Sequence, residues 1–232
     1  MCWIIVISLL VITLFLVWAS ADIGSNIYVK TICKGDTKDQ VAALTFDDGP
    51  DEVMTERVLD VLKRHNIKAT FFLIGEKVDK FPHIVRRMVE EGHTVANHTY
   101  SHKATFPMSS AENVRQELQK CNDAIYKATG LRTKLFRPPF GVTNPIIGKV
   151  LKRSDYKTIG WSIRSLDTIN DKSRNDVADK VIGKLHQGAI ILLHDRCNDA
   201  DVLLETIIAS AIEKKYTFVP LDELLKIDAY EN

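Results

Sequence analysis

Two adjacent carboxylates, Asp47 and Asp48, stand between an apolar run and a Gly-Pro break in the stretch VAALTFDDGP. Like charges side by side repel each other, so a bound cation or a shared proton would explain their placement. A solvated turn in which the two side chains face opposite ways would explain an isolated pair as well. The two aspartates therefore predict metal or acid–base chemistry only if the chain supplies partners elsewhere.

Two histidines are candidates for such partners. The stretch HTYSH, residues 98–102, carries imidazoles at positions i and i+4, which share one face if the loop makes a helical turn. Two imidazoles and one carboxylate form a catalytic metal site with open coordination positions. A pair of surface or capping histidines is an equally good explanation of this spacing alone. The remaining histidines are expected to be solvent-facing or structural: His65, His83, His93 and His186.

Strands and helices that alternate along the chain would position these groups. Short apolar runs predict strands over residues 41–46, 69–74, 94–97, 135–136, 156–161, 189–193 and 217–219. Helical periodicity predicts helices over 53–65, 76–91, 110–129, 145–153, 174–186, 201–214 and 221–225. The helix over 76–91 must accommodate Pro82 near its start.

This alternation predicts an α/β fold in the form of a distorted (β/α) barrel. About seven strand–helix units in ~190 residues favour a sheet of about seven parallel strands, complete or incomplete as a barrel. An open doubly wound sheet is the alternative. No G-x-G-x-x-G follows a strand, so a dinucleotide-binding role has no support.

Charged or titratable side chains follow five of the predicted strands. In a parallel barrel the carboxyl ends of the strands meet at one rim, where active sites are built. Placement of one such residue could be chance, but five strands in register are difficult to explain that way. The residues at this rim are Asp47, Asp48, His98, His102, Arg137, Asp167, His194 and Asp195.

The first 21 residues predict a signal peptide or a membrane anchor. Residues 3–18 are uncharged and apolar, and Ala19 and Ala21 fit a signal-peptidase site. With its neighbours the run approaches the ~20 residues that span a bilayer. A buried core helix is the weaker alternative. Residues 22–38 are expected to be a linker and leading segment, and we expect an extracytoplasmic protein, membrane-anchored or secreted.

Composition excludes some partners. The 232 residues carry 31 Lys and Arg against 30 Asp and Glu, so charge gives no case for nucleic-acid binding. The four cysteines (Cys2, Cys33, Cys121 and Cys197) are widely spaced and are interpreted as ordinary packing residues. We expect a monomer with a single catalytic domain and a hydrophobic core of its own.

Five motifs in this order resemble a known family. They are TFDDGP, HTYSH, RPPFG, an Asp after a Trp-Ser strand, and LLHD. The sequence resembles the NodB-homology polysaccharide deacetylases, carbohydrate esterase family 4, over roughly residues 39–225. The resemblance predicts a deacetylase domain over 39–232. It implies a metal-dependent hydrolase that removes N-acetyl groups from N-acetylglucosamine in a polysaccharide, with peptidoglycan as first choice and chito-oligosaccharide as second.

The resemblance also implies a role for each matching residue. The metal, Zn²⁺ by preference, with Co²⁺ or another divalent ion able to replace it, would be held by Asp48, His98 and His102. In this scheme Asp47 is the general base, Arg137 orients it, the backbone N–H of Phe140 stabilises an oxyanion, Leu192 lines the acetyl-methyl pocket, and His194 is a general acid paired with Asp167.

The fourth motif departs from the family pattern. Family members usually have W-S-x-D-[ST]-x-D-W, and this chain has WSIRSLDT over residues 161–168. Arg164 replaces the earlier Asp, and Thr168 replaces the Trp that normally forms one wall of the sugar pocket. The resemblance therefore predicts intact catalysis, and it leaves sugar affinity and preferred chain length open.

Three other functions compete with this hypothesis. An O-acetyl esterase on a polysaccharide such as acetylxylan would use the same site. A non-haem Fe(II) oxygenase also uses two His and one carboxylate, although it has no need of Asp47, Arg137 and His194. A catalytically silent carbohydrate-binding relative would have no need of an intact base, ligands and acid.

Overall fold

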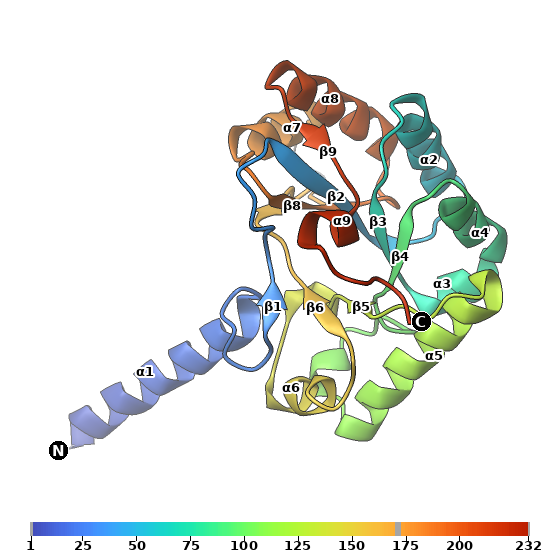
Figure 1. The fold of residues 1–232 in the computed structure, drawn as a ribbon. Coiled ribbons are helices and arrows are strands. Elements are labelled where there is room, and N and C mark those ends of the chain that lie inside the picture. Colours follow the sequence, from blue (N-terminus) through green and yellow to red (C-terminus); the bar gives the residue numbers. More distant parts are fainter. Residues whose placement is uncertain (1, 170–172, 232) are drawn as a thin grey trace.

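The computed structural model describes residues 2–169 and 173–231 of the chain. A curled sheet forms the centre of the molecule, helices cover its outer face, and one long helix projects away from the body (Figure 1). The strand pairs of this sheet are all parallel. The α/β barrel-like fold predicted from the alternation of strands and helices is confirmed.

The strand order is β1-β6-β5-β4-β3-β2-β8-β7, with β9 paired to the start of β2. The strands are β1 (Thr31–Ile32), β2 (Val41–Gly49), β3 (Thr70–Leu73), β4 (Thr94–Asn97), β5 (Leu135–Phe136), β6 (Lys157–Ile159), β7 (Ile163–Arg164), β8 (Ala189–His194) and β9 (Thr217–Phe218). Strands β2 and β8 are the longest, and they pair with each other beside the edge strand β7.

Helix α1 precedes the first strand, and the other helices are interspersed with strands along the chain. They are α1 (Cys2–Ala21), α2 (Met54–Arg64), α3 (Gly75–Lys80), α4 (Pro82–Glu90), α5 (Ala111–Thr129), α6 (Pro145–Leu151), α7 (Arg174–Gly183), α8 (Ala200–Glu213) and α9 (Leu221–Leu225), with short 3₁₀ turns at Phe106–Met108 and Pro139–Gly141. Ser110 caps the start of helix α5, where its side chain accepts a hydrogen bond from the Asn113 N–H. Gly130, in the left-handed conformation, caps the end.

Alternation along the strands divides the core into two parts. Leu44 and Phe46 of β2 point outward and pack with the helices in one large apolar cluster. Ala43 of β2 and Phe72 of β3 point into the barrel and pack against α9. Figure 1 shows α9 lying across the middle of the ring of strands. The interior below the carboxyl ends is therefore filled with apolar side chains, and the titratable candidate residues lie at the rim.

The barrel is incomplete at one seam. Within the described residues no ladder joins the two edge strands, β1 and β7. The seam is bridged by an antiparallel bridge between Lys34 and Ala189 and by a hydrogen bond from the Gly35 N–H to the Gly188 carbonyl. The segment expected as a linker and leading segment thus contributes β1 and this bridge to the sheet.

The predicted elements differ from the structure in two respects. The predicted helix over 76–91 is wrong, because the chain forms two helices, α3 and α4, separated at Phe81. A proline disfavours helical dihedrals in the preceding residue but suits the first turn of a new helix, so Pro82 ends one helix and starts the next. The seven predicted strands are present, and the two-residue strands β1 and β7 carry too little periodicity to be predicted.

Helix α1 stands apart from the barrel. Its apolar side chains are exposed, from Trp3 to Trp18, and within the described residues it is the one helix long and apolar enough to cross a membrane. A membrane anchor and a signal sequence meet this criterion equally. The end of α1 contacts the domain: Ala19 is fully buried, and the Ser20 carbonyl accepts a hydrogen bond from the Thr143 N–H at 3.0 Å.

The described cysteines pack as predicted. Cys121 and Cys197 are buried and Cys33 is partly buried, and all three are free thiols. Burial raises the pKa of the Cys121 thiol to about 12, so this side chain is an inert apolar group in the core.

Candidate active site

The two carboxylates leave β2 in different backbone conformations. Alternation that points Ala43 into the barrel also points Thr45 and Asp47 inward. Asp48 would then point outward, but its φ is +71° and the β2–β3 register shifts between Asp47 and Gly49. This irregularity turns the Asp48 side chain to the same pocket as Asp47. Aspartate tolerates the left-handed conformation better than most residues.

The turn after these carboxylates is packed too tightly for a side chain. A Cβ on Gly49 would lie 2.3 Å from Oδ2 of Asp195. Asp195 is fully buried and accepts a hydrogen bond from Thr55 Oγ1 at 2.6 Å, and burial raises its pKa to about 7. Of the two rim residues predicted after β8, His194 therefore lines the pocket and Asp195 supports the turn.

The two histidines converge without a helical turn. Residues 98–102 form a loop in which Thr99 and His102 have φ values of +68° and +47°. Thr99 Oγ1 accepts a hydrogen bond from the His102 N–H at 3.2 Å. A helical turn is therefore not what brings the imidazoles together, and both reach one place from an irregular loop: their ring centroids are 4.8 Å apart.

Both imidazoles face one oxygen of Asp48. Asp48 Oδ1 lies 3.2 Å from His102 Nε2 and 3.5 Å from His98 Nε2. Burial opposes the charged form of Asp48, but the hydrogen bond and charge of His98 outweigh it and hold the Asp48 pKa well below its ordinary value. Burial and the neighbouring His98 lower the His102 pKa to about 4, so that imidazole is neutral at neutral pH.

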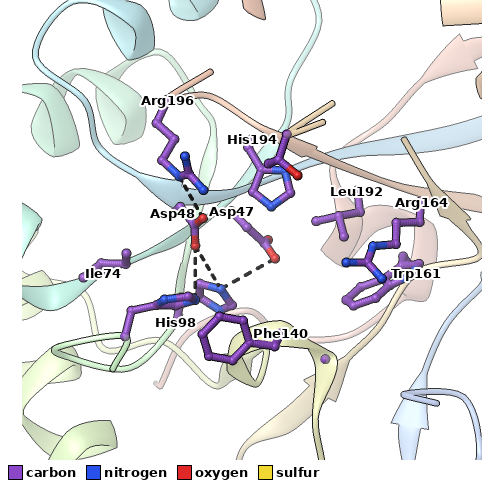
Figure 2. Close-up of a pocket in the computed structure, with 13 residues that line it drawn as sticks. Asp47, Asp48, Ile74, His98, Phe140, Trp161, Arg164, Leu192, His194 and Arg196 are labelled. Atoms are coloured by element: carbon purple, nitrogen blue, oxygen red, sulfur yellow. Dashed lines mark hydrogen bonds and ion pairs between the residues drawn. The ribbon is translucent and has the colours of Figure 1, made fainter. Parts of the chain in front are cut away.

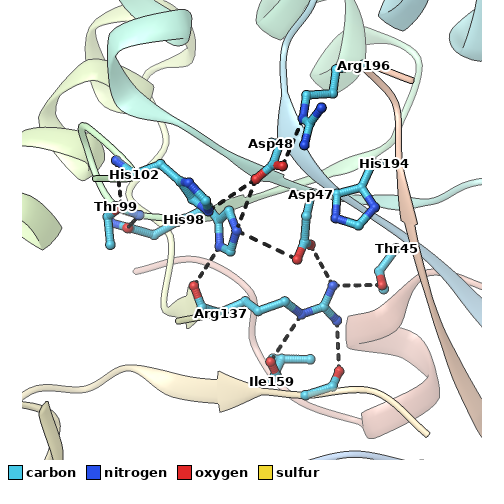
Figure 3. Close-up of polar contacts among 12 residues, drawn as sticks. Thr45, Asp47, Asp48, His98, Thr99, His102, Arg137, Ile159, His194 and Arg196 are labelled. Atoms are coloured by element: carbon cyan, nitrogen blue, oxygen red, sulfur yellow. Dashed lines mark hydrogen bonds and ion pairs between the residues drawn. The ribbon is translucent and has the colours of Figure 1, made fainter. Parts of the chain in front are cut away.

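These three residues fit a divalent metal ion. One ligand atom from each lies within 4.8 Å of the other two. His98 Nδ1 is 2.7 Å from the Arg137 carbonyl oxygen (Figure 3). Because a carbonyl only accepts, Nδ1 carries a proton, and Nε2 is the atom that this histidine can offer to a metal ion. Two imidazoles and one carboxylate match the donor set of a catalytic metal site with open positions.

Arg137 binds the second carboxylate from behind the pocket. It follows β5 and is fully buried. Its Nη1 donates to Asp47 Oδ1 at 2.6 Å and to Thr45 Oγ1 at 2.9 Å, and the remaining donors reach the carbonyls of Ile159 and Gly160 at 3.2 and 2.8 Å. Together these hydrogen bonds fix the plane of the guanidinium. The bond to Oδ1 then fixes the orientation of the Asp47 carboxylate as well.

His194 is held by a buried carboxylate on the other side of the pocket. Asp167 Oδ1 lies 2.8 Å from His194 Nδ1, and Oδ2 accepts the backbone N–H of the same histidine at 2.7 Å. Ser165 Oγ donates to Asp167 Oδ1 at 2.9 Å. Burial lowers the pKa of His194, but the hydrogen bond and charge of Asp167 more than offset this and raise it above its ordinary value.

All of these groups surround one pocket of about 370 Å³ (Figure 2). Its aromatic walls are Phe140, which is half exposed, and Trp161. A Cβ on Gly141, whose φ is +71°, would lie 2.4 Å from the Trp161 ring, so glycine is required where this loop meets the indole. The other lining residues are Asp47, Asp48, Ile74, His98, His102, Arg164, Thr168, Leu192, His194 and Arg196.

The structure thus brings the nine predicted site residues together. Seven line the pocket, while Arg137 and Asp167 lie behind it and contact Asp47 and His194. Sequence analysis missed Arg196, whose Nε lies 2.9 Å from Asp48 Oδ2. Its place directly after LLHD, on the loop that leaves the rim, was the available signal.

The fold and site define a class of protein: a parallel, incomplete barrel with a candidate metal site and acid–base groups at the carboxyl ends of its strands. The model of the polysaccharide deacetylase family matches residues 34–159, which is more than half of the chain. The chain belongs to the polysaccharide deacetylase family, carbohydrate esterase family 4, as the resemblance of its five motifs predicted.

Relatives and solved structures extend the similarity over most of the chain. The peptidoglycan-N-acetylmuramic acid deacetylase PdaA of Bacillus subtilis is 37% identical over 82% of this chain and 73% of its own length. The peptidoglycan-N-acetylglucosamine deacetylase PgdA of Listeria monocytogenes is 38% identical over 86% of this chain. This chain spans 42% of the length of that relative.

Among solved structures, the Bc1960 peptidoglycan N-acetylglucosamine deacetylase superposes with a TM-score of 0.80. It is 32% identical to this chain, and the superposition covers 86% of this chain and 94% of that one. The similarity therefore extends over most of this chain and nearly all of that one.

Proposed function

We propose that this chain is a metal-dependent deacetylase that hydrolyses the N-acetyl group of an amino sugar in peptidoglycan. The observation that carries the proposal is the arrangement of three units around one pocket: a metal-binding triad, a carboxylate fixed by a buried arginine, and a histidine paired with a buried carboxylate. Amide hydrolysis needs a group for each of three tasks, namely polarising water, accepting its proton, and protonating the leaving amine.

Asp48, His98 and His102 would hold the metal, and we propose Zn²⁺ as its identity. When bound, a divalent ion supplies Lewis acidity and lowers the pKa of water toward neutrality. The backbone carbonyl of Arg137 orients His98 through Nδ1, and Arg196 holds the second oxygen of Asp48. These contacts keep the ligand set in place before any ion arrives.

Asp47 serves as the general base that takes a proton from the attacking water. It lies next to the ligand set, with its Oδ2 3.7 Å from His98 Nε2, while its Oδ1 is held by Arg137. One oxygen is thus fixed by an ion pair and the other faces the pocket. The two adjacent aspartates therefore perform different tasks, because the irregular end of β2 gives each of them different neighbours.

The acetyl group would lie between the loop at Phe140 and the side chain of Leu192. Phe140 has a φ of +61°, and within the described part of the chain its backbone N–H has no recorded hydrogen-bond acceptor. A donor held in a strained loop at the pocket wall is suited to stabilise the negative charge that develops on the carbonyl oxygen. Leu192 lines the opposite wall and offers an apolar surface to the methyl group.

His194 serves as the general acid. An amide nitrogen leaves only when it is protonated as the C–N bond breaks. Asp167 keeps the His194 pKa above its ordinary value, so the imidazolium is available near neutral pH and donates its proton to the nitrogen. The amine departs, and acetate and the deacetylated sugar are the products.

Peptidoglycan is proposed as the substrate because the relatives with high identity carry that substrate in their names. An anchored or exported chain would meet this polymer outside the cytoplasm, which agrees with the apolar helix α1. Membrane attachment, the extracytoplasmic location and the monomeric state are part of the proposal. The same site chemistry would also cleave an O-acetyl ester, which needs a weaker acid because an alkoxide leaves more easily than an amide nitrogen.

One experiment tests the proposal directly. Acetate release would be measured from peptidoglycan, N-acetylglucosamine oligomers and acetylated xylan, with chelator and with added Zn²⁺. The proposal expects release from peptidoglycan that chelator abolishes and Zn²⁺ restores. Release from acetylated xylan alone would show an O-acetyl esterase. No release from any substrate with the metal bound would show a silent relative.

A further inference from the structure

One wall of the pocket carries a positive charge that the proposed chemistry does not use. Arg164 lies on β7, opposite Leu192 of β8, and its guanidinium carbon is 5.9 Å from the Trp161 ring. The side chain is exposed and lines the pocket. Figure 2 shows it on the side of Trp161 and Leu192, across the pocket from Ile74 and Arg196.

The other two arginines at the site are already paired. Arg137 forms its ion pair with Asp47 and is buried, and Arg196 forms one with Asp48. Within residues 2–169 and 173–231, Arg164 has no ion pair with a carboxylate. Among the described residues the two pocket aspartates are therefore matched by two arginines, and Arg164 adds a cation with no carboxylate partner there.

We propose that Arg164 recognises a carboxylate group carried by the N-acetylated sugar, so that the enzyme prefers an anionic amino sugar to a neutral one. This inference rests on the proposed function. A planar guanidinium presents paired N–H donors that match the two oxygens of a carboxylate. Thr168 also lines the pocket, and its hydroxyl can donate a further hydrogen bond to such a group.

The composition of this wall agrees with an anionic ligand. Arg164 places a guanidinium beside the Trp161 ring, and both residues line the pocket. A positive charge there attracts an anionic substituent and gives no advantage to a neutral one.

The charge also lies at the right depth. Arg164 is exposed at the mouth, while the proposed catalytic groups lie inside the pocket with their side chains largely buried. Since Arg164 pairs with Leu192 across β7 and β8, a substituent of the sugar ring would lie near Arg164 when the acetyl group contacts Leu192. The contact remains accessible to water, so its contribution is moderate and sensitive to salt.

The test compares three oligomers with the metal-loaded full chain. One is a pentamer of N-acetylglucosamine. The second is an oligomer in which N-acetylglucosamine alternates with N-acetylmuramic acid, which carries a free lactyl carboxylate. The third is the methyl ester of the second, which keeps its shape and removes the charge. The variants are Arg164→Gln, Arg164→Lys and Arg164→Asp, and the control is Arg57→Gln, which removes an exposed arginine on α2.

We expect Arg164→Gln to lower kcat/KM on the free-carboxylate oligomer by about 5–10-fold, mainly through KM, and to leave the neutral pentamer and the ester within 2-fold. Arg164→Lys should lose less and Arg164→Asp more, and Arg57→Gln should change nothing. An equal loss on all three oligomers, or a wild-type preference for the neutral pentamer, would overturn the inference. Failure of the wild type to release acetate from all three would instead reject the proposed function.

Discussion

The two sides of the pocket are built in different ways. On the catalytic side, Asp47 and Arg137 are buried, sit at the ends of strands and are fixed by several hydrogen bonds. On the sugar side, Arg164 and Thr168 are exposed and have few partners. On the proposed function, the sheet would determine the chemistry, and the segment after β6 would determine which sugar the chemistry acts on.

The two sides should therefore differ in how well they tolerate substitution. A substitution among the buried groups leaves a charge without a partner or a hydrogen bond unmade. A substitution on the sugar side changes contacts with the ligand alone. The departures from the family pattern, Arg164 and Thr168, both lie on the second side.

The largest expected effect is the loss of a metal ligand. His102→Ala should lose both bound metal and detectable activity, because a carboxylate and a single imidazole do not hold the ion in catalytic geometry. Metal content after gel filtration and acetate release would be measured together. The matched control, His83→Ala, removes an exposed histidine on α4 and should retain both. Full metal content in His102→Ala would exclude His102 as a ligand.

Loss of the general acid should come next. His194→Ala should reduce kcat by roughly 10²–10⁴-fold, because the amine is no longer protonated as it leaves. Its metal content should equal that of the wild type, since His194 is not part of the ligand set. A metal-free His194→Ala protein would show that this histidine is a ligand instead.

A smaller effect is expected from the partner of that acid. Asp167 raises the pKa of His194, and the working form is protonated, so kcat should fall as pH rises through that pKa. Asp167→Asn removes the stabilising charge, lowers the pKa and should move the alkaline limb of the kcat profile to lower pH. An alkaline limb that keeps its position would remove Asp167 from the mechanism.

The smallest expected effect lies on the sugar side. Thr168→Trp should lower KM for short N-acetylglucosamine oligomers by about 2–10-fold, because the indole supplies stacking area, and should change kcat less. The control is Ile169→Trp, at an exposed position that does not line the pocket. An unchanged KM would show that residue 168 does not contact the ring, or that Trp161 and Phe140 already provide the stacking surface.

Much of the catalytic side could be predicted from the sequence. The strands that carry Asp47, Arg137 and His194 are apolar runs with polar residues at their ends, and parallel strands bring those ends to one rim. Periodicity could not show how the adjacent residues Asp47 and Asp48 reach the same pocket, because neighbours on a strand normally face opposite sides. The left-handed Asp48 is held by Arg196 from a distant segment, and the left-handed His102 donates its N–H to Thr99 within an irregular loop.

The sugar side was harder to predict. Strand β7 is two residues long, and the chain crosses the barrel seam just before it, where the Ser162 N–H donates to the Ile190 carbonyl. No local sequence pattern predicts where the chain crosses the seam. The sequence distinguishes Arg164 and Thr168 only as departures from a family pattern. The structure shows that both residues line the pocket.

The most direct test concerns the division of labour between the adjacent aspartates. Asp47→Asn and Asp48→Asn make the same chemical change one residue apart, and asparagine tolerates the left-handed conformation of position 48. Bound metal per chain would be measured for both variants, with circular dichroism to confirm folding. The account predicts that Asp47→Asn is inactive with full metal content and that Asp48→Asn binds metal weakly. A metal-free Asp47→Asn beside a metal-loaded Asp48→Asn would contradict it.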